Sequence, residues 1–380
     1  MNIYWITQIN ENKLHKTSRM EIAEALRRRG HSVKLVIERN IGEKRTKNDD
    51  FFYLNTVKGQ IFSRIIFNLM ILLYFPFIAK RKKIDVILLD GGNVLIPFTI
   101  FLKILRIPLI LDIRTLPTSE KSTEILLFDI SLFLSKYVVN GLTTITPELK
   151  KVLIKKYRIE NLKIGIWTSG VSLNLFKKPI DTKTIINFSK NSKYFYLMYH
   201  GGYNKTRGIE NLIRSIAELE DSLKDKVKLI IIGINKNKIE DLKNLGEKLN
   251  INKNLEFIPP IDYKKIPLYI DLIDVGVIPL PPEYKWWHVS SPLKTLEYLA
   301  MGRPVIVTNI PFHESIFNKG QCGVLIKDSN PRSIASAITY LYNNREKLDD
   351  MGETGRKIIE KYYTWDIKSF ELENFIKTIL

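Results

Sequence analysis

Short apolar runs alternate with amphipathic segments along the whole chain, and this alternation restricts the possible folds more than any other feature of the sequence. The runs expected to form strands are residues 2–7, 33–37, 85–89, 108–112 and 142–146, and then 194–199, 227–232, 255–258, 274–278, 304–307 and 323–326. Apolar runs of this kind between helical segments are typical of parallel sheets covered on both faces. The pattern starts twice, so the sequence predicts an α/β protein with two Rossmann-like doubly wound domains. The carboxyl ends of their strands are expected to face a cleft, where ligands bind.

The length of 380 residues also fits two domains. The polar stretch 177–192 contains Pro179, lacks periodicity and is expected to link the halves. We expect one domain over residues 1–172, a second over residues 173–364, and a C-terminal helix at 365–380 that packs back on the first domain.

Charge and cysteine content narrow the class of protein. Lys and Arg number 59 against 40 Asp and Glu, a formal net charge of +19, which favours phosphates, nucleic acid or acidic lipid as partners. The single cysteine, Cys322, excludes a disulfide scaffold and a thiolate metal cluster and fits a reducing cytoplasm. The first residues lack the basic start and cleavage site of a signal peptide. A cytoplasmic protein is therefore expected.

One apolar segment allows two interpretations. Residues 65–79 carry no formal charge and are followed by Lys-Arg-Lys-Lys at 80–83. They are fewer than the roughly 20 residues that a spanning helix needs. The segment is either a buried helix of the first domain or a helix on an anionic membrane surface, with residues 65–83 as the contact.

Residues 288–306 form the most informative stretch. Ser291 followed by Pro292 predicts a helix start, with the serine as N-cap and the proline at the first helical position. The free N–H groups at such a start attract phosphate, and Lys294 in the first turn adds a positive charge. Glu297 lies about 9 Å along the helix from Ser291, which is roughly the distance from a diphosphate to the ribose of one nucleotide. The alternative is a capped amphipathic helix with a solvated Lys–Glu face.

A second stretch, residues 199–208, lies between a predicted strand and a predicted helix. Gly201 and Gly202 would let backbone N–H groups approach a ligand closely. Lys205 and Arg207 supply charge for a phosphate. A basic surface turn is the alternative.

Together these stretches resemble the retaining group 1 glycosyltransferases of family 4, which have the GT-B fold. The specific part is S-P-x-K-x-x-E-Y-x-A-x-G-x-P-V-I from Ser291, about ninety residues after the paired glycines. Residues 26–33 are similar to the family's L-x-x-R-G-H-x-V, residues 168–176 to P-N-G-V-D-x-x-x-F, and residues 311–316 to G-x-x-E-x-I. The resemblance runs essentially from end to end.

The resemblance implies roles for single residues. Glu297 matches the glutamate that binds the donor ribose, and Arg207 matches the basic residue that grips the donor diphosphate. Leu293 and Lys294 match the positions whose backbone N–H groups contact the diphosphate. The first domain would receive the acceptor and the second would bind the nucleotide-sugar, with Arg207, Lys294 and Glu297 as catalytic residues. The remaining expected donor contacts are Gly201, Gly202, Lys205 and Ser291.

The sequence departs from the family pattern at two places. The family's first glutamate falls at Val289, so the donor sugar is expected to be read by the preceding loop, through Trp287 or His288. The family's N-terminal Gly-Gly loop is replaced by residues 12–16, where His15 is a candidate acceptor contact. On the first domain, Asp112 or Arg114 would orient the acceptor hydroxyl, or would form a structural ion pair.

No metal and no cofactor are expected, because the chain has no D-x-D pair to hold a divalent ion on a diphosphate. Arg207, Lys294 and the helix terminus would offset the charge of the departing diphosphate. The sequence thus predicts a metal-independent, retaining glycosyltransferase that uses a nucleotide-diphosphate sugar. Its acceptor would be a saccharide or lipid-linked hydroxyl in cell-surface polysaccharide or glycolipid synthesis, at the inner face of the cell membrane. Replacing Glu297 or Arg207 by alanine should then abolish transfer while the fold survives.

Three alternatives remain open. The first is a nucleotide-sugar epimerase of the same fold, which needs no acceptor. The second is a non-catalytic GT-B partner protein, for which Val289 is the argument. A nucleic-acid-binding protein is disfavoured, since Lys and Arg are spread through the chain rather than gathered among aromatic residues.

Overall fold

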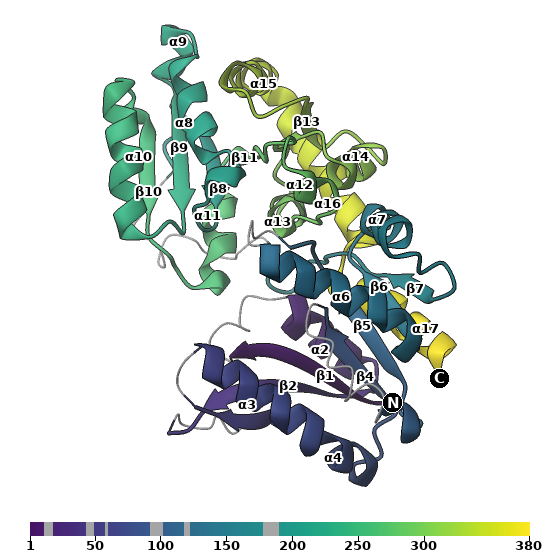
Figure 1. Ribbon diagram of the computed structural model, residues 1–380. Coiled ribbons are helices and arrows are strands. Elements are labelled where there is room, and N and C mark those ends of the chain that lie inside the picture. The colour runs from purple at the N-terminus through teal and green to yellow at the C-terminus, as the bar shows by residue number, and fades with distance from the viewer. Residues whose placement is uncertain (11–17, 43–48, 58–59, 92–101, 118–121, 178–189) are drawn as a thin grey trace. The chain divides into compact units, whose positions relative to one another are not determined.

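A computed structural model describes residues 1–10, 18–42, 49–57, 60–91, 102–117, 122–177 and 190–380 (Figure 1). These residues fold into two compact α/β units. Unit 1 comprises Met1–Ser169 and Trp365–Leu380, and unit 2 comprises Gly170–Thr364. The sequence-based boundary was 172/173. Most of the expected linker, residues 178–189, lies outside the described residues.

Unit 1 is built on a seven-stranded parallel sheet with the order β3-β2-β1-β4-β5-β6-β7. Its strands are β1 (Asn2–Asn10), β2 (Ser32–Asn40), β3 (Phe51–Thr56), β4 (Val86–Asp90), β5 (Leu109–Ile113), β6 (Gly141–Thr144) and β7 (Lys163–Ile166). Every residue of the central strands β4 and β5 is buried, as expected where helices cover both faces. The five strands predicted in this half are confirmed, and the two that the sequence missed, β3 and β7, are the edges of the sheet.

The helices of unit 1 cover both faces of this sheet. They are α2 (Ser18–Arg28), α3 (Gln60–Leu73), α4 (Phe75–Arg81), α6 (Ser122–Val138), α7 (Pro147–Tyr157) and α17 (Trp365–Ile379). The C-terminal α17 packs on α2 and β7: Arg29 pairs with Glu373, and a Cβ on Gly165 would lie 2.5 Å from the Phe375 ring. The apolar segment 65–79 is divided between α3 and α4, which part at Tyr74. Among the described residues, no helix combines the length and the apolar character needed to cross a bilayer.

Unit 2 is built on a six-stranded sheet with the order β10-β9-β8-β11-β12-β13, parallel throughout. The strands are β8 (Phe195–His200), β9 (Val227–Ile232), β10 (Leu255–Ile258), β11 (Val275–Ile278), β12 (Val305–Thr308) and β13 (Gly323–Ile326). All six strands predicted in the second half are confirmed.

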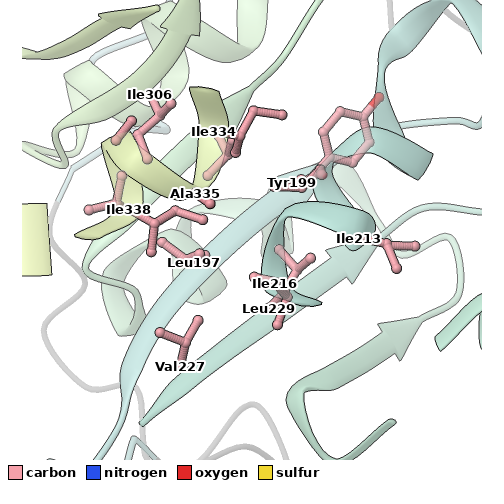
Figure 2. Packing of buried hydrophobic residues seen from close by; sticks show 14 of the residues in the cluster. Leu197, Tyr199, Ile213, Ile216, Val227, Leu229, Ile306, Ile334, Ala335 and Ile338 are labelled. Carbon is pink, nitrogen blue, oxygen red and sulfur yellow. The ribbon is translucent and has the colours of Figure 1, made fainter. Parts of the chain in front are cut away.

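Side chains of the central strand β8 alternate between the two faces of this sheet. Leu197 and Tyr199 enter the core formed with α8 and α15, which Figure 2 shows from close by, and Tyr196 and Met198 enter the core on the other face. Because both faces are buried, the strand is a continuous apolar run in the sequence.

The helices of unit 2 are mostly short. They are α8 (Ile209–Ala217), α9 (Asp221–Lys224), α10 (Lys236–Lys248), α11 (Ile266–Leu272), α12 (Lys285–His288), α13 (Leu293–Ala300), α14 (Pro311–Phe317), α15 (Pro331–Asn343) and α16 (Leu348–Tyr362), with 3-10 turns η1 (Lys205–Arg207), η2 (Asn252–Asn254), η3 (Tyr263–Lys265) and η4 (Arg345–Lys347). The strand order reverses direction between β8 and β11. Ligands of such sheets bind beyond the carboxyl ends of the strands at this reversal.

Candidate active site

Helix α13 lies directly on the sheet of unit 2, and one side chain fixes its position. The hydroxyl of Tyr298 donates to the Met198 carbonyl of β8 at 2.9 Å. The ring occupies the space beside Gly276 of β11, where a Cβ would lie 2.3 Å from it. The strand residue must therefore be a glycine for the helix to approach this closely. Tyr298 thereby anchors the helix that carries Lys294 and Glu297.

The N-terminus of α13 differs from the sequence prediction. Pro292 takes the N-cap position rather than the first helical one, and the helix begins at Leu293. Ser291 is thus not the N-cap, and the N-cap proline makes no side-chain cap bond. The prediction failed because Pro292 has an extended backbone, with a ψ of 116°, which moves the helix start by one residue. The first N–H groups of a helix have no partner within the helix and attract anions.

Two cations of unit 2 converge on Gly201, just beyond β8. An ideal Cβ on Gly201 would lie 2.9 Å from Nζ of Lys294 and 3.6 Å from Nη1 of Arg207. Lys294 reaches this place across the ring of Tyr199, with Nζ 5.2 Å from the ring centroid. Like charges held this close repel one another, so an anion between them would stabilise the arrangement.

The loop that carries Arg207 is held in shape by its own residues. The side-chain oxygen of Asn204 accepts from the backbone N–H of Thr206 at 3.0 Å. Gly208 has a φ of 71°, and a Cβ there would lie 2.0 Å from the Pro279 carbonyl oxygen after β11. Only glycine fits this close contact between the two central strand ends. Of the other expected donor contacts, Gly202 and Lys205 are exposed.

Glu297 is buried and bonded inside unit 2. Its Oε1 accepts from the Tyr263 hydroxyl at 2.6 Å, and its Oε2 lies 3.1 Å from Nε2 of His200. The latter is a close contact without the alignment of a good hydrogen bond. Burial opposes ionisation of Glu297, but His200, Tyr263 and Lys294 outweigh it and hold its pKa below the usual value. The side chain is therefore a carboxylate at neutral pH.

The sequence analysis did not select His200 or Tyr263 as site residues. His200 is the last residue of β8, and its place at a strand's carboxyl end was a usable signal. Tyr263 begins the 3-10 turn η3 and carries no motif, so only the folded chain brings it to Glu297.

A buried histidine joins α14 to the first turn of α13. Nδ1 of His313 lies 2.8 Å from the Thr308 carbonyl and must carry a proton, because a carbonyl only accepts. Nε2 then accepts from the Thr295 hydroxyl at 2.9 Å. Burial lowers the pKa of His313 to about 4, so the neutral ring fixes the helix turn that carries Lys294.

His313 is expected to make the protein lose stability as the pH falls from about 6.5 to about 4. An unfolded histidine has a pKa of about 6.5, so in this window the unfolded state binds the proton more readily than the folded state. The free energy of unfolding should fall by roughly 3 kcal/mol across the window. Urea denaturation at several pH values measures it. His313→Gln should flatten this dependence, whereas His288→Gln, at an exposed site, should not; equal slopes in both variants would refute the assignment.

The residues before α13 are tied to the protein itself. The indole N–H of Trp287 donates to the Thr206 carbonyl at 2.9 Å, and Nε2 of His288 lies 2.7 Å from the Pro282 carbonyl. Val289, at the position of the family's first glutamate, is buried. These contacts fix the loop, and a role for Trp287 or His288 in reading a sugar stays a prediction.

In unit 1, charged side chains gather at the carboxyl ends of β4 and β5. Arg19 pairs with Asp90 at 2.8 Å. Asp112 accepts from the Thr143 hydroxyl and the Trp167 indole, at 2.7 and 3.1 Å, and burial raises its pKa.

Arg114 of the same strand end lies against Trp167. Its guanidinium stacks over the indole ring at 3.4 Å and donates to the Trp167 carbonyl at 2.7 Å, and burial lowers its pKa to about 10. Asp112 and Arg114 thus both contact Trp167, and neither the acceptor role nor the structural ion pair is tested by these contacts. His15 lies outside the described residues.

A pocket of 480 Å³ lies at the other end of α13 and does not include these residues. Its lining includes Arg303 and Arg356, which bond to Asp271 and to the Ala300 carbonyl respectively. Both arginines are therefore already engaged. In the part of the chain that the structure describes, no three side chains of His, Cys, Asp or Glu gather as metal ligands would.

The segment that contains this site is similar to known proteins. Residues 181–358 match the family model of glycosyl transferases group 1. The segment is thus similar to the domain shared by group 1 glycosyltransferases. An uncharacterized glycosyltransferase of Methanocaldococcus jannaschii is 26% identical over 216 residues, which are 56% of this chain and 53% of that protein. A D-inositol 3-phosphate glycosyltransferase of Pseudarthrobacter chlorophenolicus is 25% identical over 202 residues, which are 53% and 47% of the two chains. The chain thus spans about half the length of these curated relatives.

Solved glycosyltransferase structures cover the whole chain. Sucrose-phosphate synthase from Thermosynechococcus elongatus superposes with a TM-score of 0.77 at 14% identity, over 100% of this chain and 99% of that one. Anabaena HepE in complex with UDP-glucose gives 0.74 at 13% identity, over 100% of both chains. At such low identity the likeness establishes the fold alone. The two sheets and these neighbours identify a two-domain, Rossmann-like GT-B fold, as the sequence predicted.

Proposed function

We propose that the protein transfers a sugar from a nucleotide-diphosphate sugar to a hydroxyl acceptor. The observation that carries this proposal is the convergence of Lys294 and Arg207 on Gly201. Lys294 belongs to the first turn of helix α13, whose N-cap is Pro292. Two cations and the N-terminus of a helix together suit a diphosphate, which carries more charge than one cation offsets.

The donor would lie along α13. The diphosphate would occupy the place between Lys294 and Arg207, with backbone contacts from Gly201, Gly202 and Leu293. The ribose hydroxyls would donate to Glu297, whose carboxylate has lone pairs beyond those used by Tyr263 and His200. The match to a group 1 glycosyltransferase domain and the fold shared with a UDP-glucose complex support a nucleotide-sugar donor.

Lys294 and Arg207 would also stabilise the diphosphate as it departs. Charge that develops on a leaving group is stabilised most by groups already held in place. We propose that these two side chains and the α13 terminus suffice without a divalent ion. Retention of configuration follows from the family resemblance and is part of the proposal.

The acceptor would be a hydroxyl of a saccharide or of a lipid-linked saccharide, used in cell-surface polysaccharide or glycolipid synthesis. The carboxyl ends of β4 and β5, with Asp112 and Arg114, are the proposed acceptor side of unit 1. A cytoplasmic protein working peripherally at the inner face of the cell membrane would meet both substrates.

Binding of one nucleotide class in the absence of metal tests the donor site. The purified protein is heated with UDP-, GDP-, ADP-, dTDP- and CMP-sugars, each with and without magnesium. A ligand at 100 times its Kd should stabilise the protein by about 2.7 kcal/mol. Failure of all five to shift the Tm would contradict the proposal. Conversion of the donor to an isomer without any acceptor would identify an epimerase instead.

A further inference from the structure

The outward face of α3 and α4 is apolar. On α3, Phe62, Ile65, Leu69 and Leu73 are 48–68% exposed and lie within an arc of about 80° at 100° per residue. The opposite side of the helix is buried in unit 1 through Ser63, Phe67 and Ile71. The stripe continues into α4 with Phe77, 67% exposed. The core of unit 1 therefore uses only one side of a helix that is apolar on both.

Helix α6 repeats the arrangement. Leu126, Ile130, Phe133 and Tyr137 are 45–61% exposed and lie within an arc of about 60°. The side facing the sheet is buried, through residues such as Leu132. A single exposed hydrophobic residue is ordinary on a protein surface, but two continuous stripes are not.

Both stripes lie on the same face of the unit 1 sheet. Helices α3 and α4 connect β3 to β4, and α6 connects β5 to β6 (Figure 1), so the chain crosses the sheet in one direction in both connections. Right-handed crossovers in one direction place their helices on one face, opposite α2, which connects β1 to β2 in the reverse direction. Exposed Ile104 lies beside the end of α6, since Lys103 donates to the Tyr137 carbonyl there. We call this surface the apolar face.

Exposed large hydrophobic side chains are concentrated on the apolar face. The described residues include 16 exposed large hydrophobic side chains, and all but four belong to α3, α4, α6 or the residues directly beside them. The four others are Ile41, Tyr340, Phe370 and Leu380.

The same face carries exposed cations at its border. Helix α4 ends with Lys80 and Arg81 and is followed by Lys82 and Lys83. Two further exposed cations, Lys103 and Arg106, lie on either side of Ile104 in the sequence.

In helix α6, the charged side chains of Lys136 and Asp129 make different contacts. Lys136 lies over the rings of Phe133 and Tyr137. Asp129 is paired with Lys156 of α7, so it does not offset the border cations.

We propose that the apolar face docks on the surface of an anionic phospholipid bilayer. Apolar side chains at the level of the acyl chains, with Lys and Arg at the level of the headgroups, are what interfacial binding requires. The basic border selects the bilayer over a second copy of the chain, because a symmetric dimer through this face would bring two sets of these cations to one interface. The proposal rests on unit 1 alone and does not depend on the reaction proposed for unit 2.

Vesicle sedimentation of the full chain tests the proposal. The probes are vesicles of phosphatidylcholine alone and of phosphatidylcholine mixed equally with phosphatidylglycerol. The wild type should sediment with the anionic vesicles, weakly with the neutral ones, and be released by high salt. Leu69→Glu with Phe133→Glu should lower binding at least about tenfold. Lys80→Glu with Arg81→Glu should do the same, since each cation near such a surface contributes about fivefold.

Matched controls are placed on unit 2. Tyr340→Glu replaces an exposed hydrophobic residue of α15, and Lys243→Glu with Lys248→Glu reverses two exposed charges of α10; both should bind vesicles like the wild type. The Tm and the shift caused by a UDP-sugar are recorded for every variant, so a failure of the donor site is seen separately. Absent binding of the wild type, or equal binding of all variants, would overturn the proposal. The proposal would also be overturned if the wild type self-associated in the absence of lipid and the double variant Leu69→Glu with Phe133→Glu did not.

Discussion

Replacing Lys294 with alanine is expected to lower kcat/KM for glycosyl transfer by about 10²–10³-fold and to leave the fold intact. The ammonium group lies beside Gly201 and Arg207, where the leaving diphosphate is proposed to gather charge. The loss of one preorganised group of this kind typically has an effect of that size. Initial rates at several donor concentrations measure it, and Arg207→Ala should behave in the same way.

Two further variants separate this effect from a general loss of charge. Lys243→Ala removes an exposed cation of α10 and should leave kcat/KM unchanged. Gly201→Ala keeps both cations but puts a Cβ 2.5 Å from Cε of Lys294, at a residue with a φ of 122°, so it should weaken donor binding. A Lys294→Ala enzyme within about twofold of wild type would contradict the assignment.

Replacing Glu297 with alanine is expected to lower the free energy of unfolding by about 3–5 kcal/mol as well as to abolish transfer. The carboxylate is buried between the Tyr263 hydroxyl and His200. Its removal takes away a buried acceptor of the Tyr263 hydroxyl and leaves a cavity, and both losses are strongly destabilising. For a unit of this size the Tm should fall on the order of 10 °C. The sequence alone led to the expectation that the fold would survive this substitution, and the burial of Glu297 changes that expectation.

Glu297→Gln separates the two effects. The amide keeps the shape of the side chain and can still accept from Tyr263, so most of the stability should return. The negative charge beside the proposed ribose is lost, so transfer should stay low. Calorimetry and rate measurements on both variants check this. Full activity in a folded Glu297→Gln protein would remove Glu297 from the donor site.

The limits of the sequence are clear at the start of α13. The Ser-Pro pair correctly indicated a helix start, and the periodicity correctly gave a helix that ends before Gly302. The identity of the cap was wrong, because one backbone angle at Pro292 decides which residue begins the helix. Local propensity does not fix such an angle when the strand and helix on either side are held by tertiary packing.

The apolar face illustrates the same limit on a larger scale. The sequence identified residues 65–79 as apolar and left open whether they are buried. A helix that is apolar on all sides has no periodicity that reveals which side meets the sheet. Only the structure shows that Leu69 faces outward while Phe67 and Ile71 are buried.

By itself, the sequence determined the α/β class, the two sheets and every central strand, because strands buried on both faces must be continuous apolar runs. It did not reveal the edge strands β3 and β7, which are only partly buried and lack that pattern. Only the tertiary structure brought Lys294 to Arg207 at Gly201, and Tyr263 and His200 to Glu297. These residues come from a strand end, from loops and from a helix that are separate in the sequence. Their meeting depends on strand order and on how closely α13 packs against the sheet, which no local pattern encodes.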